Sequence, residues 1–71
     1  MERILKRLRQ KHGLSQRELA RKAGVSASYI CNAETRGFEL YPGQAERLAT
    51  ALDWEGDPSD LTKEANENDV A

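Results

Sequence analysis

The sequence has little of what metal-binding, catalytic or secreted proteins usually need. Its 71 residues include one cysteine, Cys31, and one histidine, His12. A single cysteine excludes a disulfide within the chain and is typical of a reducing compartment, so we expect a cytoplasmic location. These two residues cannot supply the ligands of a structural metal site. We therefore expect no metal and no other cofactor.

Long apolar runs and catalytic constellations are also missing. No stretch approaches the roughly 20 apolar residues of a membrane span, and no apolar signal-peptide run follows the N-terminus, so we expect no membrane partner. The sequence contains no Ser/His/Asp set, no paired carboxylates at a plausible site and no glycine-rich phosphate loop, which argues against an enzyme. A chain this small buries only about 60% of its unfolded surface, enough for a helical core but not for an enclosed substrate cavity.

Charge is unevenly distributed, although the net charge is only −1. Residues 1–38 carry nine Lys or Arg and three acids, a net charge of +6, whereas residues 39–71 carry two Lys or Arg and nine acids, a net charge of −7. A basic half is the electrostatic signature of a nucleic-acid-binding surface. For any single Lys or Arg, a solvated position without function is the simpler interpretation.

Helices are favoured throughout, because Ala, Leu, Arg and Glu are common and β-branched residues are few. Apolar residues recur at helical spacing, and turn and capping residues separate the segments. This patterning predicts helices at 1–12, 16–23, 27–35, 42–52 and 58–64. Together they predict an all-α, compact four- to five-helix bundle in residues 1–65, followed by a frayed polar tail at 66–71.

The two central segments, 16–23 and 27–35, are expected to form a helix-turn-helix. Gly24 suits the positive φ that often ends a helix, and Ser26 can cap the next one. Ala20 is small enough for the two helices to cross closely. Upstream, Ser15 and Glu18 have the spacing of a capping box, Ser-x-x-Glu.

The pattern Gln-x-x-Leu-Ala-x-x-Ala-Gly-Val-Ser-x-x-x-Ile-x-x-Ala-Glu resembles that of the Cro/CI-like (XRE-type) DNA-binding domains of phage and bacterial repressors. The resemblance covers about residues 2–53 and implies a lambda-repressor-like fold that binds double-stranded DNA. It further implies a sequence-specific transcriptional regulator, most often a repressor that occludes its operator, and a homodimer on a two-fold symmetric site. Two departures are the ending Glu34-Thr35-Arg36-Gly37, longer than the usual one, and Ala33, where a larger aliphatic is common.

The second motif helix would then be the recognition helix, with an uncharged outer face. Helical spacing places Ala27, Ser28, Cys31 and Asn32 outside, while Ile30 and Ala33 turn inward. In this interpretation Asn32 contacts adenine, Ser28 contacts several bases, and Ala27 packs on a thymine methyl group. No guanine-reading Arg or Lys lies on this face.

Four residues are candidates for phosphate binding: Gln16, Arg17, Tyr29 and Arg36. Gln16 matches the phosphate clamp of the family, at a helix N-terminus whose N–H groups attract anions; the alternative is a plain first-turn residue. Tyr29 either contacts phosphate or packs against the first motif helix. Arg36 would reach the sugar-phosphate backbone.

Two residue pairs carry structural expectations. By resemblance, Arg9 pairs with Glu34, because a partly buried Arg requires a carboxylate; the alternative is an exposed Arg9 on phosphate. Trp54 and Leu61 either form a dimer contact or close one end of the core. The alternative function is an antitoxin or adaptor-type protein-interaction module on the same fold, whose acidic C-terminal half binds a basic surface.

Overall fold

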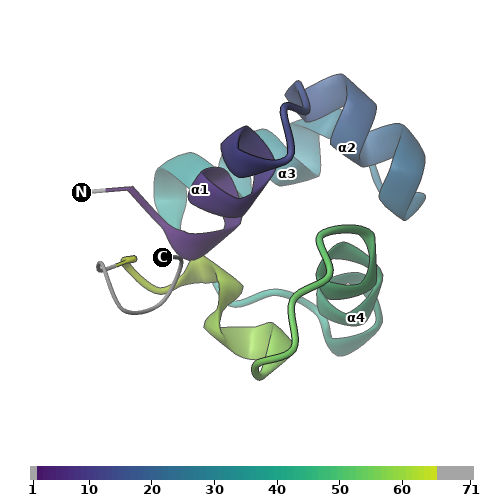
Figure 1. Cartoon of the computed structure of the whole chain (residues 1–71). Coiled ribbons are helices and arrows are strands. Elements are labelled where there is room, and N and C mark those ends of the chain that lie inside the picture. The colour runs from purple at the N-terminus through teal and green to yellow at the C-terminus, as the bar shows by residue number, and fades with distance from the viewer. Residues whose placement is uncertain (1, 66–71) are drawn as a thin grey trace.

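This computed structural model describes residues 2–65 of the chain, which contain five helical segments joined by short loops. They are α1 (Ile4–Lys11), α2 (Gln16–Ala23), α3 (Ala27–Arg36), α4 (Pro42–Ala51) and a 3-10 helix, η1 (Pro58–Thr62) (Figure 1). The predicted all-α bundle with a helix-turn-helix is confirmed. The tail expected at 66–71 lies outside the described residues.

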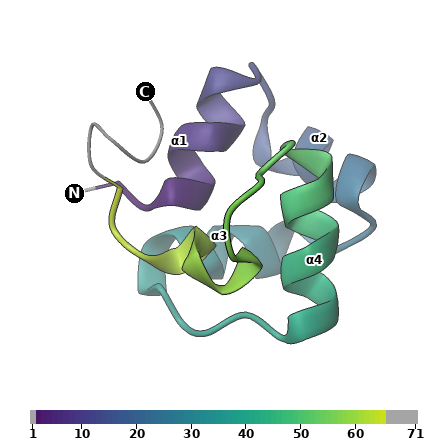
Figure 2. The same cartoon turned by 60° about the horizontal axis from the view of Figure 1, so that its bottom comes forward.

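The helices surround one small apolar core. Helix α2 packs against α3 and α4, while η1 packs against α4 and α1. The 3-10 helix η1 therefore covers the side of the bundle that α2 leaves open (Figure 2). The largest fully buried side chains come from every one of these elements or their ends: Leu5, Leu19, Ile30, Leu48, Leu52 and Leu61. The core therefore fixes the position of α3, the helix expected to face DNA.

The final helix differs from the prediction. An α-helix is expected at 58–64, but Pro58–Thr62 forms a 3-10 helix. The predicted start is correct, because the Asp57 side chain accepts a hydrogen bond from the Ser59 N–H and Pro58 occupies the first turn. The helix ends at Thr62, and the backbone of Lys63 is extended. Five residues are too few for a stable α-helix, and the extended chain gains long-range contacts instead.

Those contacts join the two ends of the described chain. Arg3 and Glu64 form an isolated antiparallel bridge, flanked by hydrogen bonds from Ile4 N to Lys63 O, 3.0 Å, and from Ala65 N to Glu2 O, 2.9 Å. The sequence predicts a helix that starts at residue 1, whereas α1 starts at Ile4. This pairing explains the difference, because it holds the chain before Ile4 in an extended conformation. Residues far apart in sequence thus close the bundle.

The turn between α2 and α3 is held by local caps and by one long-range contact. Gly24 has a φ of 74°, and the Ser26 side chain accepts a hydrogen bond from the Tyr29 N–H. The Arg47 guanidinium, from α4, donates to the Gly24 carbonyl oxygen at 3.2 Å. The cap on α2 is the predicted box of Ser15 and Glu18. The helix-turn-helix is thus fixed at both ends of its turn.

Glycine substitutions should have opposite effects at two positions. We expect Gly24→Ala to lower the free energy of unfolding by about 1–2 kcal/mol, because a β-carbon is unfavourable at this positive φ. Gly43 is the second residue of α4, and a β-carbon added there would meet no atom of another part of the protein within 4 Å. Gly43→Ala should therefore raise stability by about 0.5–1 kcal/mol. Urea unfolding of both variants tests the pair, and an unchanged or raised stability of Gly24→Ala would contradict the assignment of the turn.

The capping box predicts a pH dependence of stability. The Ser15 N–H donates to the Glu18 carboxylate at 2.9 Å and, with the Ser15 hydroxyl, holds the pKa of Glu18 below its ordinary value of 4.5. A depressed folded-state pKa stabilises the protein above the unfolded pKa, and this contribution is lost as the pH falls through the folded pKa. Gln at position 18 can still cap the helix but does not titrate. We therefore expect the unfolding free energy of Glu18→Gln to fall less steeply than that of the unchanged protein as the pH drops below about 4.5. An acid limb of unchanged slope would refute this.

Candidate nucleic-acid interface

The outer side of α3 is a strip of small, uncharged side chains. Ser28, Cys31, Asn32 and Thr35 are all exposed, and at 100° per residue they share one side of the helix. The opposite side is fixed by Ile30 and Ala33, which are fully buried. Ala27, the third predicted base reader, is half-buried against the core and marks the edge of the strip. The strip can therefore approach a base edge closely.

The unusual sequence at the end of α3 lengthens the helix. Thr35 and Arg36 are both helical, and Gly37 caps the helix with a φ of 65°. The Thr35 hydroxyl donates a hydrogen bond to the Cys31 carbonyl oxygen at 2.8 Å. As a result Thr35 joins the exposed strip, a position that the sequence analysis does not assign to it. Continuing the helical spacing one turn past Cys31 would have found it.

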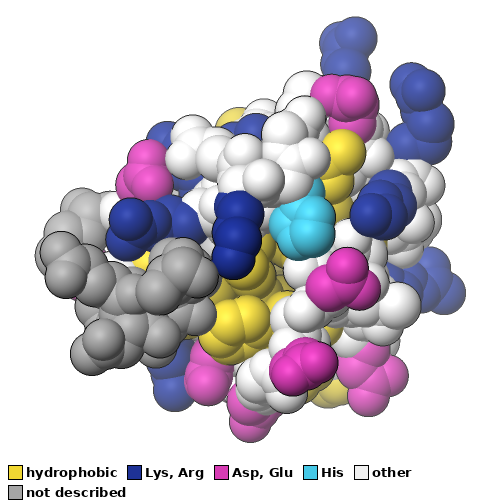
Figure 3. Space-filling model, in the orientation of Figure 1, with side chains coloured by type: hydrophobic (Ala, Val, Ile, Leu, Met, Phe, Trp, Pro, Cys, Tyr) yellow, Lys and Arg dark blue, Asp and Glu magenta, His cyan; other side chains and the backbone are white. Residues whose placement is uncertain are grey.

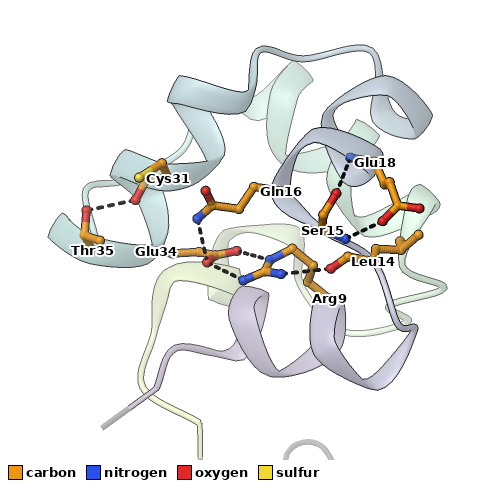
Figure 4. Close-up of polar contacts among 8 residues, drawn as sticks. All are labelled: Arg9, Leu14, Ser15, Gln16, Glu18, Cys31, Glu34 and Thr35. Atoms are coloured by element: carbon orange, nitrogen blue, oxygen red, sulfur yellow. Dashed lines mark hydrogen bonds and ion pairs between the residues drawn. The ribbon is translucent and has the colours of Figure 1, made fainter.

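Arg9 and Glu34 form a bidentate ion pair that attaches α3 to α1 (Figure 4). Arg9 Nε lies 2.7 Å from Glu34 Oε2, and Arg9 Nη2 lies 3.0 Å from Glu34 Oε1. The Glu34 side chain is only 3% exposed and that of Arg9 13%. The hydrogen bond from Arg9 to Glu34 raises the pKa of the Arg9 guanidinium above its ordinary value. A third hydrogen bond joins Arg9 Nη1 to the Leu14 carbonyl oxygen at 2.8 Å.

Gln16 belongs to the same network. Its side-chain nitrogen lies 3.2 Å from Glu34 Oε1, so this amide is attached to α3 although Gln16 begins α2 (Figure 4). An amide nitrogen carries two protons, and one is enough for this bond. The second proton and the first-turn N–H groups of α2 remain chemically suited to an anion. Glu34 thereby orients the residue predicted to clamp phosphate.

Tyr29 packs in a way that neither sequence alternative describes. Its ring lies edge-on to Phe38, with centroids 5.4 Å apart, and stacks on Tyr41 at 6.3 Å. Its hydroxyl oxygen accepts a hydrogen bond from the Tyr41 N–H at 3.0 Å. Tyr29 thus supports the loop between α3 and α4. The hydroxyl proton is not used in that bond and can be donated to an acceptor such as phosphate.

Positive and negative side chains gather over different elements. In Figure 3 Lys and Arg side chains project around the upper right, over α2, and others lie on the left, while most Asp and Glu side chains lie below, over α4 and η1. Arg17 and Arg36, two of the predicted phosphate ligands, are exposed. A polyanion is therefore attracted to the helix-turn-helix half and repelled by the other half.

The two candidate dimer residues have different positions. Leu61 is 0% exposed, so of the two alternatives its side chain fills the core and is not available for a dimer contact. Trp54 is half-buried, and its indole N–H donates to the Asp57 carbonyl oxygen at 3.0 Å. Of the two, Trp54 retains surface that a second copy could reach.

Other kinds of site are not apparent between residues 2 and 65. No group of three or more His, Cys, Asp or Glu in this range is placed to hold a metal ion. His12 is instead attached to the end of α4, with Nε2 at 3.0 Å from the Leu52 carbonyl oxygen. None of the described helices is long and apolar enough to cross a membrane.

Comparison with known families agrees with this geometry. The helix-turn-helix family HTH_3, of the XRE type, matches residues 5–53, from α1 to just past α4. The chain belongs to this family. Its members are DNA-binding transcription regulators, and the matched region contains the exposed strip of α3 and the Arg9–Glu34 ion pair. No curated protein sequence matches the chain.

Solved structures of the same fold include two with substantial sequence identity. The restriction-modification controller protein C.AhdI from Aeromonas hydrophila is 37% identical, with a TM-score of 0.67 over 80% of this chain and 83% of that one. The N-terminal DNA-binding domain of SinR from Bacillus subtilis is 31% identical, with a TM-score of 0.72 over 89% of this chain and 90% of that one. The matched region thus makes up more than four fifths of each of these structures.

Proposed function

We propose that this protein is a sequence-specific repressor that acts in the cytoplasm by occluding an operator. The observation that carries the proposal is the uncharged strip of α3, exposed on a rigid helix and placed on the basic half of the molecule. Small side chains can approach base edges in the major groove, while flanking cations hold the phosphates. The likeness to a controller protein and to the DNA-binding domain of SinR supports this proposal.

Each group has a defined role in the proposed complex. Gln16, Arg17, Tyr29 and Arg36 bind phosphates and set the position of α3 in the groove. Ala27, Ser28 and Asn32 read base edges, with the Asn32 amide paired to adenine N6 and N7. Two of these four residues, Arg17 and Arg36, are cations, so the slope of log affinity against log salt should be roughly −2 per subunit.

We further propose that two copies bind a two-fold symmetric operator, with half-sites about 34 Å apart. Trp54 is the candidate contact. Glu46, Asp53 and Glu55 line the same groove as Trp54, so two such faces repel one another at neutral pH. The expected dimer is therefore weak in the free protein and forms on DNA.

Selection of bound sequences from random duplexes tests the proposal. We expect an enriched symmetric motif whose two halves are separated by one helical turn. Occlusion is then tested by placing this motif across a promoter in a purified transcription reaction, where the protein should block polymerase binding. Selection that enriches no motif would contradict the proposed specificity, and transcription that is unaffected or increased would contradict repression.

A second candidate function is an adaptor that binds a basic partner protein. One observation favours it: the groove along α4 and η1 has the apolar residues Ala49, Trp54 and Pro58, with carboxylates around them and no Lys or Arg among its lining residues. A purified neighbouring gene product that binds this groove should lose affinity when Glu46 and Glu55 are changed to Gln. DNA binding should not weaken in that variant, because the loss of these carboxylates only reduces the proposed repulsion between two copies.

A further inference from the structure

One side of the exposed strip on α3 is chemically more apolar than the sequence suggests. Ser28, Cys31 and Thr35 follow one another at helical spacings of three and four residues, so they form a line along this side of the strip. Asn32 lies beside this line. The last two members, Cys31 and Thr35, lie on the C-terminal half of α3.

Thr35 has no proton left to donate to a base. Its hydroxyl proton is used in the 2.8 Å hydrogen bond to the Cys31 carbonyl oxygen (Figure 4). This bond also restricts the rotation of a β-branched side chain whose rotamers are already few. Thr35 is exposed, so it presents to a base its fixed methyl group and the lone pairs of its hydroxyl oxygen, which can accept a hydrogen bond only from adenine N6 or cytosine N4. Cys31 is a weak donor and behaves as a small apolar side chain.

These features determine which base fits best beneath Thr35. Guanine is read through O6 and N7 by Arg or Lys, and no such side chain lies on the line. Thymine alone presents an apolar group, the C5 methyl, in the major groove. We infer that Thr35 is a specificity-determining residue, whose methyl group packs against the C5 methyl of a thymine in each half-site. This inference rests on the proposed DNA-binding function and names part of the sequence that is bound.

Replacement of thymine by uracil in the duplex tests the inference, because the two bases differ only in this methyl group. Each thymine of the selected half-site is changed in turn to deoxyuridine, and the dissociation constant is measured by fluorescence anisotropy. At one thymine, the one that contacts Thr35, we expect the change to deoxyuridine to weaken binding about four-fold. A loss of this size corresponds to the burial of a single methyl group.

Two substitutions assign that loss to the Thr35 methyl group. Thr35→Ser removes the methyl but keeps the hydroxyl, so the variant should bind about four-fold more weakly and no longer distinguish thymine from uracil there. Thr35→Val keeps a methyl group and loses the hydroxyl, so discrimination should persist. Thr50→Ser makes the same chemical change at an exposed position of α4. This control variant should change neither the affinity for the duplex nor the discrimination between thymine and uracil. Circular dichroism shows whether each variant is folded.

The outcomes separate this inference from the proposed function. If the selected duplex binds but Thr35→Ser still distinguishes thymine from uracil at every position, the inference is overturned and the proposed function stands. If discrimination disappears in Thr35→Val as well, the hydroxyl and not the methyl is responsible, which also overturns it. If no duplex binds at any ionic strength, the proposed function fails, and the inference fails with it.

Discussion

Replacing Glu34 with alanine is expected to cost about 3–5 kcal/mol of unfolding free energy, a large part of the stability of a domain this small. The substitution leaves the Arg9 guanidinium largely buried without its carboxylate. The Gln16 amide loses its acceptor at the same time. Urea unfolding followed by circular dichroism in the far ultraviolet measures the effect.

A second ion pair supplies the matched control. Arg7 and Glu2 lie 3.9 Å apart, and their side chains are 41% and 44% exposed. Because an exposed pair contributes only about 0–1 kcal/mol, Glu2→Ala should change stability little. Equal, small losses for Glu34→Ala and Glu2→Ala would contradict the structural role of the buried pair.

Asn32→Ala and Arg17→Ala should weaken DNA binding in different ways. Loss of the Asn32 amide removes a base contact, so discrimination should fall by about 1–3 kcal/mol at one position of the half-site, with little change elsewhere. Loss of Arg17 removes a phosphate contact, so affinity should fall for every sequence alike. The salt slope should become shallower by about 1.

Binding of the two variants to the selected site and its single-base variants, at several salt concentrations, separates these effects. Lys63→Ala is a suitable control for Arg17→Ala, because Lys63 is paired with Asp60 at 2.7 Å on the acidic half. Uniform losses across all sequences for both Asn32→Ala and Arg17→Ala would refute the division between base and phosphate contacts.

Much of the helix-turn-helix could be predicted because its determinants are local. Ser15, Gly24 and Ser26 act within a few residues of their own position, and each has the conformation or hydrogen bond that the sequence predicts. The Arg9–Glu34 expectation crosses 25 residues and comes from family resemblance. Local chemistry alone does not specify so distant a partner.

The features that sequence reasoning misses depend on distant contacts or on helix length. Nothing near Arg3 indicates that it pairs with Glu64, and without that bridge the ends of α1 and η1 cannot be placed. The packing of Tyr29 is missed because its ring contacts Phe38 and Tyr41, from a loop with no periodic pattern. Thr35 is omitted because the recognition helix is expected to end there and instead continues to Arg36.

Amide chemical shifts on titration with duplex DNA test the central claim most directly. At low ionic strength, with the selected duplex, the largest shifts should fall on α3 and the first turn of α2, while amides of η1 and the C-terminal turn of α4 should move little. Small shifts along α3, or larger ones on the acidic half, would contradict the proposal that the uncharged strip of α3 enters the major groove.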